Sequence, residues 1–130
     1  MNEVYDFIKK CKVFYVATVE GDQPHTRPFG ALDLFDGRIY IQTAKPKSVA
    51  KQIAVNPKVE ICAYDGEKWL RIRATLVEDS RKEARQHMLD ANPNLKKRYS
   101  VDDDITMLLY LKDAVATFSS FTEPPREVSF

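Results

Sequence analysis

The sequence has no surplus of charge of either sign, because 20 Lys and Arg side chains face 19 Asp and Glu side chains, a net charge of +1. A chain this balanced lacks the broad basic surface of a dedicated nucleic-acid binder or a polybasic membrane-surface protein. It also lacks any run approaching the roughly 20 apolar residues of a membrane-spanning helix. We therefore expect no nucleic-acid partner and no membrane partner.

Residues that build metal centres and nucleophilic sites are scarce. The two cysteines, Cys11 and Cys62, are too few for a disulfide framework, and we expect both as reduced thiols. The two histidines, His25 and His87, do not have the spacing of zinc ligands, so no metal site is expected. The four glycines form no phosphate-binding motif, and no Gly-x-Ser-x-Gly motif is present. If the protein is an enzyme, a cofactor is expected to carry the reaction, and the catalytic side chains are unknown.

Length and composition set two further expectations. A chain of 130 residues suits one domain over 1–130. With 44% hydrophobic and 30% charged residues, its composition is that of a folded chain. The first residues, Met1-Asn2-Glu3-Val4, lack the basic-then-apolar pattern of a secretory signal, so we expect a cytoplasmic protein.

Hydrophobic periodicity predicts short helices between longer runs of strand. Apolar residues recur at helical spacing over 2–10, 47–55 and 81–91. Strands are predicted over 13–19, 25–35, 38–43, 58–64, 68–77 and 107–121, the last with a kink at Lys112-Asp113. Turn signals such as Asp36-Gly37 favour antiparallel pairing of neighbouring strands. The predicted fold class is mainly β with short helices (α+β), an antiparallel barrel with helical insertions.

Three segments carry more polar or rigid chemistry than their predicted elements need. Residues 25–30 interrupt a strand with Pro28 and Gly30. Residues 42–48 join a strand end to a helix start, where hydroxyls and lysines gather beside the first-turn amides. That combination suits a phosphate, although a solvated loop with ordinary lysines fits the same residues. Residues 68–73 alternate in character and fit a solvated strand face or a functional one.

Taken in order, these segments resemble the pyridoxamine 5'-phosphate oxidase-like, FMN-binding split-barrel family. The resemblance spans about residues 13–130. It is carried by Phe-Tyr-Val-Ala-Thr-Val at 14–19, Pro-His-Thr-Arg-Pro-Phe at 24–29, Ile-Tyr-Ile-Gln-Thr at 39–43, Lys-Ser-Val-Ala-Lys-Gln-Ile at 47–53 with Asn-Pro-Lys-Val at 56–59, and Trp-Leu-Arg-Ile-Arg-Ala at 69–74. The family implies a six-stranded antiparallel split β-barrel that forms a homodimer, with FMN bound at the interface between the subunits.

The resemblance also implies which residues bind the cofactor. Residues 27–30 would run along the flavin ring, 42–43 would meet its ribityl–phosphate part, and 47–48 would hold the phosphate. Residues 51–52 would lie one helical turn further on, and two residues of the strand over 68–77 would approach the cofactor or the interface. The full set of cofactor-binding residues is Arg27, Pro28, Phe29, Gly30, Gln42, Thr43, Lys47, Ser48, Lys51, Gln52, Trp69 and Arg71.

The function that the resemblance implies is an FMN-dependent oxidoreductase that acts on a small molecule, with NAD(P)H as a candidate electron donor. Two alternatives stay open: a non-catalytic flavin-binding or electron-carrier protein, and a cofactor-less barrel that serves as an interaction protein. Relatives of this size also use a deazaflavin or haem in place of FMN.

Two features of the chain refine this expectation. Full-length pyridoxamine phosphate oxidases end in a substrate-binding segment with Arg and His, whereas this chain ends Pro-Pro-Arg-Glu-Val-Ser-Phe, so vitamin B6 oxidation is not expected. A barrel of this size is filled by its own side chains. A flavin-sized ligand therefore needs a wall from a second subunit, which agrees with the implied homodimer.

Overall fold

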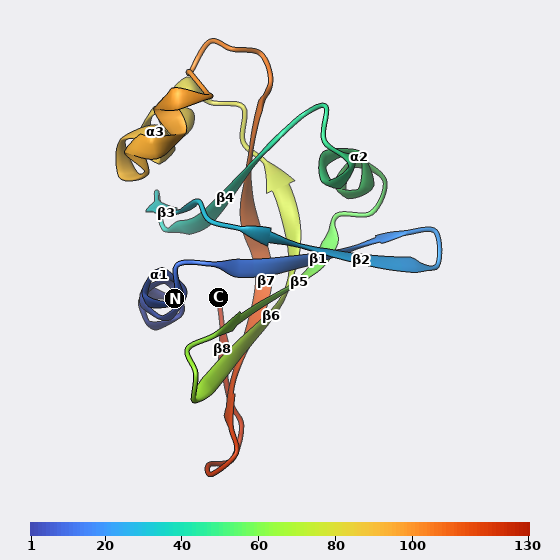
Figure 1. Ribbon diagram of the computed structural model, residues 1–130, viewed down its shortest axis with the longest axis vertical. Helices are drawn as coiled ribbons and strands as arrows, with labels where there is room; N and C mark the ends of the chain where they lie inside the picture. Colours follow the sequence, from blue (N-terminus) through green and yellow to red (C-terminus); the bar gives the residue numbers. More distant parts are fainter.

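A single sheet of eight strands organises the computed structural model, which describes residues 1–130 (Figure 1). The strands are β1 (Phe14–Glu20), β2 (Gln23–Phe29), β3 (Leu32–Phe35), β4 (Arg38–Ala44), β5 (Lys58–Tyr64), β6 (Lys68–Glu78), β7 (Thr106–Ser120) and β8 (Arg126–Ser129). Seven of them follow the order β2-β1-β5-β6-β7-β4-β3, and β8 pairs with β7. All neighbouring strands are antiparallel.

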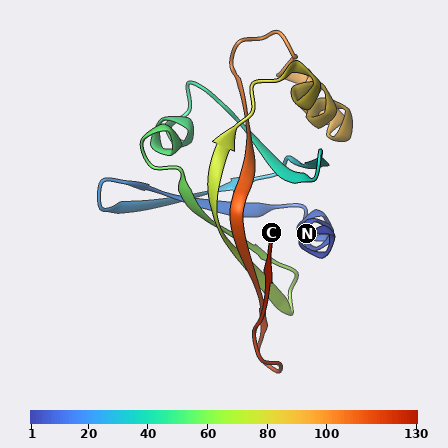
Figure 2. The ribbon, with the colours of Figure 1, turned by 180° about the vertical axis from the view of Figure 1, so that it is seen from behind.

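The two edges of this sheet, β2 and β3, are consecutive in the chain. Only Gly30 and Ala31 separate them, so the sheet curls until its two edges come close together. Because β2 and β3 do not pair with each other, the barrel is split rather than closed. The β1–β2 hairpin extends beyond the barrel and projects from the body of the molecule in both views (Figures 1 and 2).

Alternation along the strands decides which side chains fill the barrel. On β6, Leu70, Ile72, Ala74 and Leu76 are buried, and the residues between them face outward. Equivalent residues of the other strands complete a core cluster of 23 buried residues. The barrel interior is therefore filled by the chain's own side chains, as expected for a small barrel.

Three α-helices pack against the sheet. Helices α1 (Asn2–Cys11) and α2 (Ser48–Val55) each add an apolar stripe to the main core. Helix α3 (Lys82–Ala91) packs separately, on a small cluster that includes Tyr40 and Leu108. None of the helices is long and apolar enough to cross a membrane.

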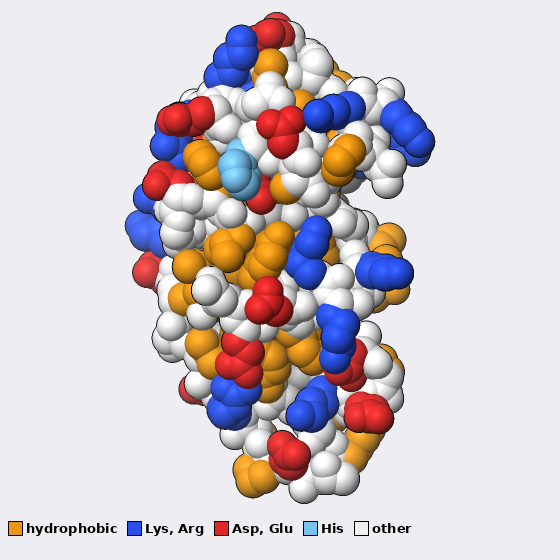
Figure 3. Space-filling model, turned by 90° about the vertical axis from the view of Figure 1, so that its left-hand side faces the viewer, with side chains coloured by type: hydrophobic (Ala, Val, Ile, Leu, Met, Phe, Trp, Pro, Cys, Tyr) orange, Lys and Arg blue, Asp and Glu red, His pale blue; other side chains and the backbone are white.

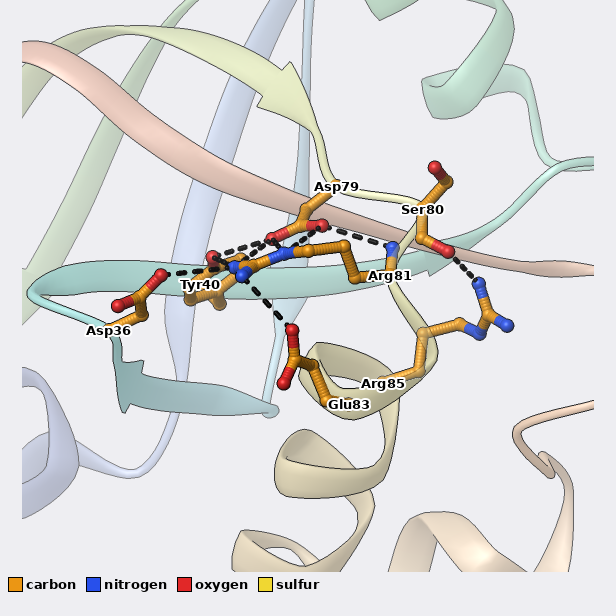
Figure 4. A network of polar contacts seen from close by, with 7 residues as sticks. All are labelled: Asp36, Tyr40, Asp79, Ser80, Arg81, Glu83 and Arg85. Atoms are coloured by element: carbon orange, nitrogen blue, oxygen red, sulfur yellow. Dashed lines mark hydrogen bonds and ion pairs between the residues drawn. The ribbon is translucent and has the colours of Figure 1, made fainter.

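A network of polar contacts fixes the start of α3 against β4 (Figure 4). The Asp79 carboxylate accepts the Tyr40 hydroxyl at 2.7 Å and two N–H groups of Arg81, from Nε at 3.0 Å and Nη2 at 2.9 Å. Arg81 also donates to Asp36 at 3.2 Å and to Glu83 at 3.3 Å. The Arg81 hydrogen bonds lower the pKa of Asp79 to about 2. Arg81 is thus surrounded by carboxylates.

The other end of α3 is attached to β3. The His87 ring contacts the buried Asp33 carboxylate, with 2.7 Å between Nδ1 and Oδ2. The Asn92 side-chain amide donates to the Leu32 carbonyl at 3.0 Å. These contacts set where the chain leaves α3 and enters the 3₁₀ helix η1 (Pro93–Lys97).

The sequence-based prediction of the fold class, mainly β with short helices in a split barrel, is confirmed. The three predicted helices match α1, α2 and α3 to within one residue at each end. The predicted kink lies where expected, because Asp113 has a φ of 53° and the register between β6 and β7 shifts opposite it.

The expected number of six strands was wrong, because the sheet has eight. The strand predicted over 25–35 is two strands, β2 and β3, since the chain turns at Gly30 and Ala31 from one edge of the barrel to the other. The residues after Pro124-Pro125, over which no strand is predicted, pair with β7 as β8.

Candidate functional site

A groove of ≈ 710 Å³ opens between the β2–β3 link and the segment that follows α3. This volume falls in the range of small-molecule and cofactor sites, about 300–1,000 Å³. In Figure 3 the outline of the molecule is indented at mid-height on the right, with Lys and Arg side chains above and below the indentation. The groove's lining residues come from four stretches of chain, within 27–31, 42–43, 47–49 and 91–99.

The groove carries four cations and no anion. Arg27, Lys47, Lys97 and Arg98 line it, and none of the 17 lining residues is Asp or Glu. None of the four cations belongs to any of the ion pairs of the structure. In a chain whose net charge is only +1, this concentration of positive charge favours an anionic ligand.

The Arg27 guanidinium is held in place by neutral acceptors alone. Its Nη1 donates to the Val16 carbonyl at 3.1 Å and to Thr18 Oγ1 at 2.7 Å, and its Nη2 donates to Gln52 Oε1 at 2.8 Å. Thr18 in turn donates to Gln52 Oε1 at 2.5 Å. Partial burial lowers the pKa of Arg27 from its ordinary value. The guanidinium is therefore oriented by the chain, but its charge is not neutralised by it.

Gln42 presents a buried amide that has no partner in the chain. The residue is 7% exposed, and neither its Nε2 nor its Oε1 makes a hydrogen bond. An unsatisfied buried polar group costs about 1–3 kcal/mol, so most such groups in folded proteins are paired. Because Gln42 lines the groove, a ligand that offers one acceptor and one donor would satisfy both atoms.

The groove brings together seven of the twelve residues that the sequence assigns to the cofactor. They come from β2 and the link after it, from the end of β4, and from the start of α2. The seven are Arg27, Pro28, Phe29, Gly30, Gln42, Thr43 and Lys47. Residues up to 20 apart in the sequence thus meet around one opening, as the cofactor assignment requires.

The remaining α2 residues of the assignment lie elsewhere. Ser48 and Lys51 are exposed and do not line the groove. Gln52 is 6% exposed and contacts Arg27 and Thr18 rather than the opening. Its place fits a residue that orients Arg27 better than one that binds a ligand directly.

Trp69 and Arg71 lie on the outer face of β6, outside the groove of their own chain. Trp69 packs against Phe121, with 5.0 Å between the ring centroids. Arg71 is exposed and stands opposite Cys62 of β5 in the sheet register. Within one chain, neither side chain joins the seven assigned residues that line the groove.

Sequence reasoning missed Thr18 and assigned no individual residue of the groove wall over 91–99. Thr18 is the one hydroxyl among the inward-facing residues of β1, whose other members are Phe14 and Val16. A polar residue at an inward position of an apolar strand is the signal that would have found it. The wall over 91–99 has no such signal, because it depends on how α3 attaches to the sheet.

Comparison with known proteins places these features in a family. The family model for pyridoxamine 5'-phosphate oxidase matches residues 1–118. The structure of a NimC/NimA family protein from Clostridium acetobutylicum is 40% identical, with a TM-score of 0.97, and the match covers 100% of this chain and 92% of that one. No curated protein matches the chain.

Two more distant structures share the fold. A pyridoxamine 5'-phosphate oxidase-related, FMN-binding protein from Nostoc punctiforme has a TM-score of 0.62 at 13% identity, with 99% of this chain and 95% of that chain covered. A heme-binding protein from Mycobacterium smegmatis has a TM-score of 0.77 at 15% identity, with 98% of this chain and 56% of that chain covered.

Proposed function

The chain belongs to the pyridoxamine 5'-phosphate oxidase family, and we propose that it is a flavoprotein that binds FMN in this groove and transfers electrons to a small molecule. One observation carries the proposal: the acid-free groove contains an oriented, uncompensated guanidinium and an unpartnered buried amide. FMN has the matching chemistry, since it combines a phosphate with a ring edge of alternating carbonyl and N–H groups.

Each part of the groove has a role in holding the cofactor. Lys47 and Thr43 lie where β4 leads into α2, and an ammonium and a hydroxyl beside a helix start are suited to a phosphate. The Gln42 amide is suited to the polar edge of the ring. Arg27 supplies a fixed positive charge that would stabilise negative charge developing on the flavin ring. Because the guanidinium is already oriented, no side chain has to rearrange for this.

The bound cofactor would supply reversible electron transfer, a chemistry that side chains perform poorly. The chain's own contribution is binding, orientation and charge. No His, Cys, Asp or Glu lines the groove. The side chains best suited to exchange a proton near neutral pH are therefore missing, and protons would be exchanged with water.

The choice of FMN over haem follows from the same lining. Haem iron takes an axial ligand such as His, Cys, Met or Tyr. Of these, only Tyr99 lines the groove, whereas cations and amide groups dominate it. The Nostoc protein is described as FMN-binding and the Mycobacterium protein as heme-binding, and the donor set of this chain is closer to what the first ligand requires. A deazaflavin fits the same groups and is the second candidate.

The second part of the proposal is a homodimer that completes the groove. The outer face of β1, β5 and β6 carries exposed aromatic side chains, and Phe121, which directly follows β7, adds one more beside them. Tyr15 is 49% exposed, Tyr64 is 58% exposed and Phe121 next to Trp69 is 88% exposed. A second copy of the chain on this face would cover these rings.

A dimer also accounts for Trp69 and Arg71, which lie on this outer face and outside their own groove. They would approach the groove of the second copy. Replacing Tyr15 with Glu should shift the protein to monomers in analytical ultracentrifugation, because the change places a charge in the interface. Val55→Glu is the control, since Val55 is 88% exposed on α2. A wild-type protein that sediments as a monomer contradicts the dimer.

Cofactor binding is tested by the absorbance spectrum of the purified protein and by fluorescence titration with FMN. Lys47→Glu reverses the charge beside the phosphate and should weaken FMN binding by about tenfold or more. Lys58→Glu makes the same change at an exposed residue of β5 outside the groove and should leave binding unchanged. A colourless protein that ignores added FMN contradicts the proposal and favours a cofactor-less interaction protein.

Turnover separates the two flavoprotein alternatives. An oxidoreductase should consume NADPH or NADH in the presence of an electron acceptor, and its absorbance should bleach when the acceptor is absent. A protein that binds FMN but shows no turnover with any donor and acceptor pair is a flavin-binding or electron-carrier protein.

A further inference from the structure

Three side chains from three different elements form a closed set of hydrogen bonds around the Arg27 guanidinium. Arg27 lies on β2, Thr18 on the neighbouring strand β1, and Gln52 on α2. Arg27 Nη1 donates to Thr18 Oγ1 at 2.7 Å, and Arg27 Nη2 donates to Gln52 Oε1 at 2.8 Å. The Thr18 hydroxyl donates to the same Gln52 oxygen at 2.5 Å. Each of the three side chains therefore contacts the other two.

Thr18 and Gln52 lie behind the cation rather than at the opening. Thr18 is 1% exposed and Gln52 is 6% exposed, and neither lines the groove, whereas Arg27 does. A cofactor in the groove would therefore meet the guanidinium and not the two side chains that hold it. This makes Thr18 and Gln52 candidates for positioning residues, which act on a ligand only through Arg27.

Both acceptors are neutral, and at position 52 an ionised alternative of the same size exists. A glutamate carboxylate would accept from the guanidinium through a charge-assisted hydrogen bond, which is about twice as strong as a neutral one. It would also cancel much of the positive charge that Arg27 brings to the groove. The amide of Gln52 gives the weaker contact but leaves the charge uncompensated, since Arg27 belongs to no ion pair.

We propose that Thr18 and Gln52 fix the Arg27 guanidinium at the groove without neutralising it, and that the neutral side chain of Gln52 thereby raises the reduction potential of the bound flavin. This inference rests on the proposed function and deepens it. Reduction adds negative charge to the flavin ring, and a fixed positive charge nearby stabilises the reduced form more than the oxidised form. A carboxylate in place of the Gln52 amide would remove much of that difference.

The first test measures the reduction potential of the FMN-loaded protein by equilibration with a dye of known potential. Gln52→Glu keeps the size of the side chain and should bind reduced FMN about tenfold more weakly relative to oxidised FMN. For a two-electron couple this is a fall of about 30 mV in the potential. Gln23→Glu is the matched control at the exposed start of β2, outside the groove, and should leave the potential unchanged. An unchanged potential in Gln52→Glu would overturn the inference.

Two further variants separate the orientation of the guanidinium from its charge. Gln52→Met removes the amide without adding a charge, and Thr18→Val removes the hydroxyl while keeping the shape of the side chain. Each leaves Arg27 charged but less well fixed, and each should weaken FMN binding by about threefold to tenfold. Their potentials should fall less than that of Gln52→Glu.

These two variants also decide the matter if Gln52→Glu does not fold. Reduced stability with unchanged FMN affinity in both would show that Thr18 and Gln52 are structural residues only, and would overturn their positioning role.

Urea denaturation of the cofactor-free protein tests the positioning without any flavin. Gln52→Glu is compared in the wild-type and Arg27→Met backgrounds, as a double-mutant cycle. The introduced carboxylate has a cation beside it in the first background, whereas in the second it is buried without one. The substitution should therefore lower the urea midpoint much more in the Arg27→Met background. Equal effects in the two backgrounds would show that Gln52 does not hold Arg27.

The two proposals can fail separately. If the wild type does not bind FMN, the proposed function fails and the effect on the potential fails with it, whereas the urea cycle still decides whether Gln52 positions Arg27. If FMN binds and Gln52→Glu leaves its potential unchanged, the proposed function stands and the further inference is wrong.

Discussion

Two arginines, Arg27 and Arg81, are each fixed by several hydrogen bonds, but their charges are met in opposite ways. Arg81 donates to three carboxylates, those of Asp36, Asp79 and Glu83. Arg27 donates only to a carbonyl, a hydroxyl and a side-chain amide. The Arg81 network is complete within the chain and holds α3 in place. The Arg27 network orients a charge that the chain leaves available, and this is what a binding site for an anion requires.

The largest effect is expected from Arg27→Met. The variant loses a charge-assisted contact to the ligand and should bind FMN about 30- to 100-fold more weakly in a fluorescence titration. Its melting temperature should change little, because Thr18 and Gln52 still hydrogen-bond to each other. Arg38→Met is the control for removing an exposed arginine outside the groove. A large drop in stability with unchanged FMN affinity would show that Arg27, like Arg81, is a structural residue.

Asp79→Asn should have the opposite profile. It removes the negative charge that pairs with Arg81 and one of the two oxygens that accept from Arg81 and the Tyr40 hydroxyl, at an expected cost of about 2 kcal/mol in the free energy of unfolding. Urea denaturation measures this loss. FMN affinity should change by no more than about threefold, since the folded groove keeps its cations.

The same carboxylate predicts a dependence of stability on pH. The pKa of Asp79 is lowered from 3.8 to about 2, so its contribution is present above pH 3.8 and is lost as the pH falls toward about 2. The gap in stability between wild type and Asp79→Asn should therefore narrow over this window. A gap of constant size from pH 5 to pH 2 would show that the ion pair is not its source.

The smallest effect is expected from Gln42→Leu. This variant changes no charge, so it separates the contribution of the groove's neutral amide from that of Arg27. Removing the unpartnered amide should stabilise the cofactor-free protein by about 1 kcal/mol. The same change should weaken FMN binding by about tenfold, since the ring edge loses its polar partner. A variant that is less stable than the wild type would show that Gln42 is satisfied within the chain.

The sequence was sufficient to predict most of the fold, because strand alternation and helical spacing are local signals. The division of residues 25–35 into β2 and β3 was not predicted, since it follows from barrel closure rather than from local preference. The pairing of β8 was missed for a similar reason: Arg126 to Ser129 are mostly exposed and carry little hydrophobic signal.

The candidate site shows the same division between local and long-range information. Residues 27–30 and 42–47 were found because they interrupt or end a strand with polar groups. The role of Gln52 toward Arg27 and the wall that carries Lys97 and Arg98 depend on contacts between elements far apart in the sequence. Whether Trp69 and Arg71 meet a cofactor depends on a second chain, and a single sequence carries no direct signal of that contact.

The central claim is that Lys47, an unpaired cation of the groove at the start of α2, binds the phosphate of a flavin. The most direct test is to titrate the cofactor-free protein with FMN and with riboflavin, which has the same ring and ribityl chain but no phosphate. FMN should bind at least about tenfold more tightly, and the difference should shrink as the salt concentration rises. Equal affinity for the two molecules, or no binding of either, would contradict the account.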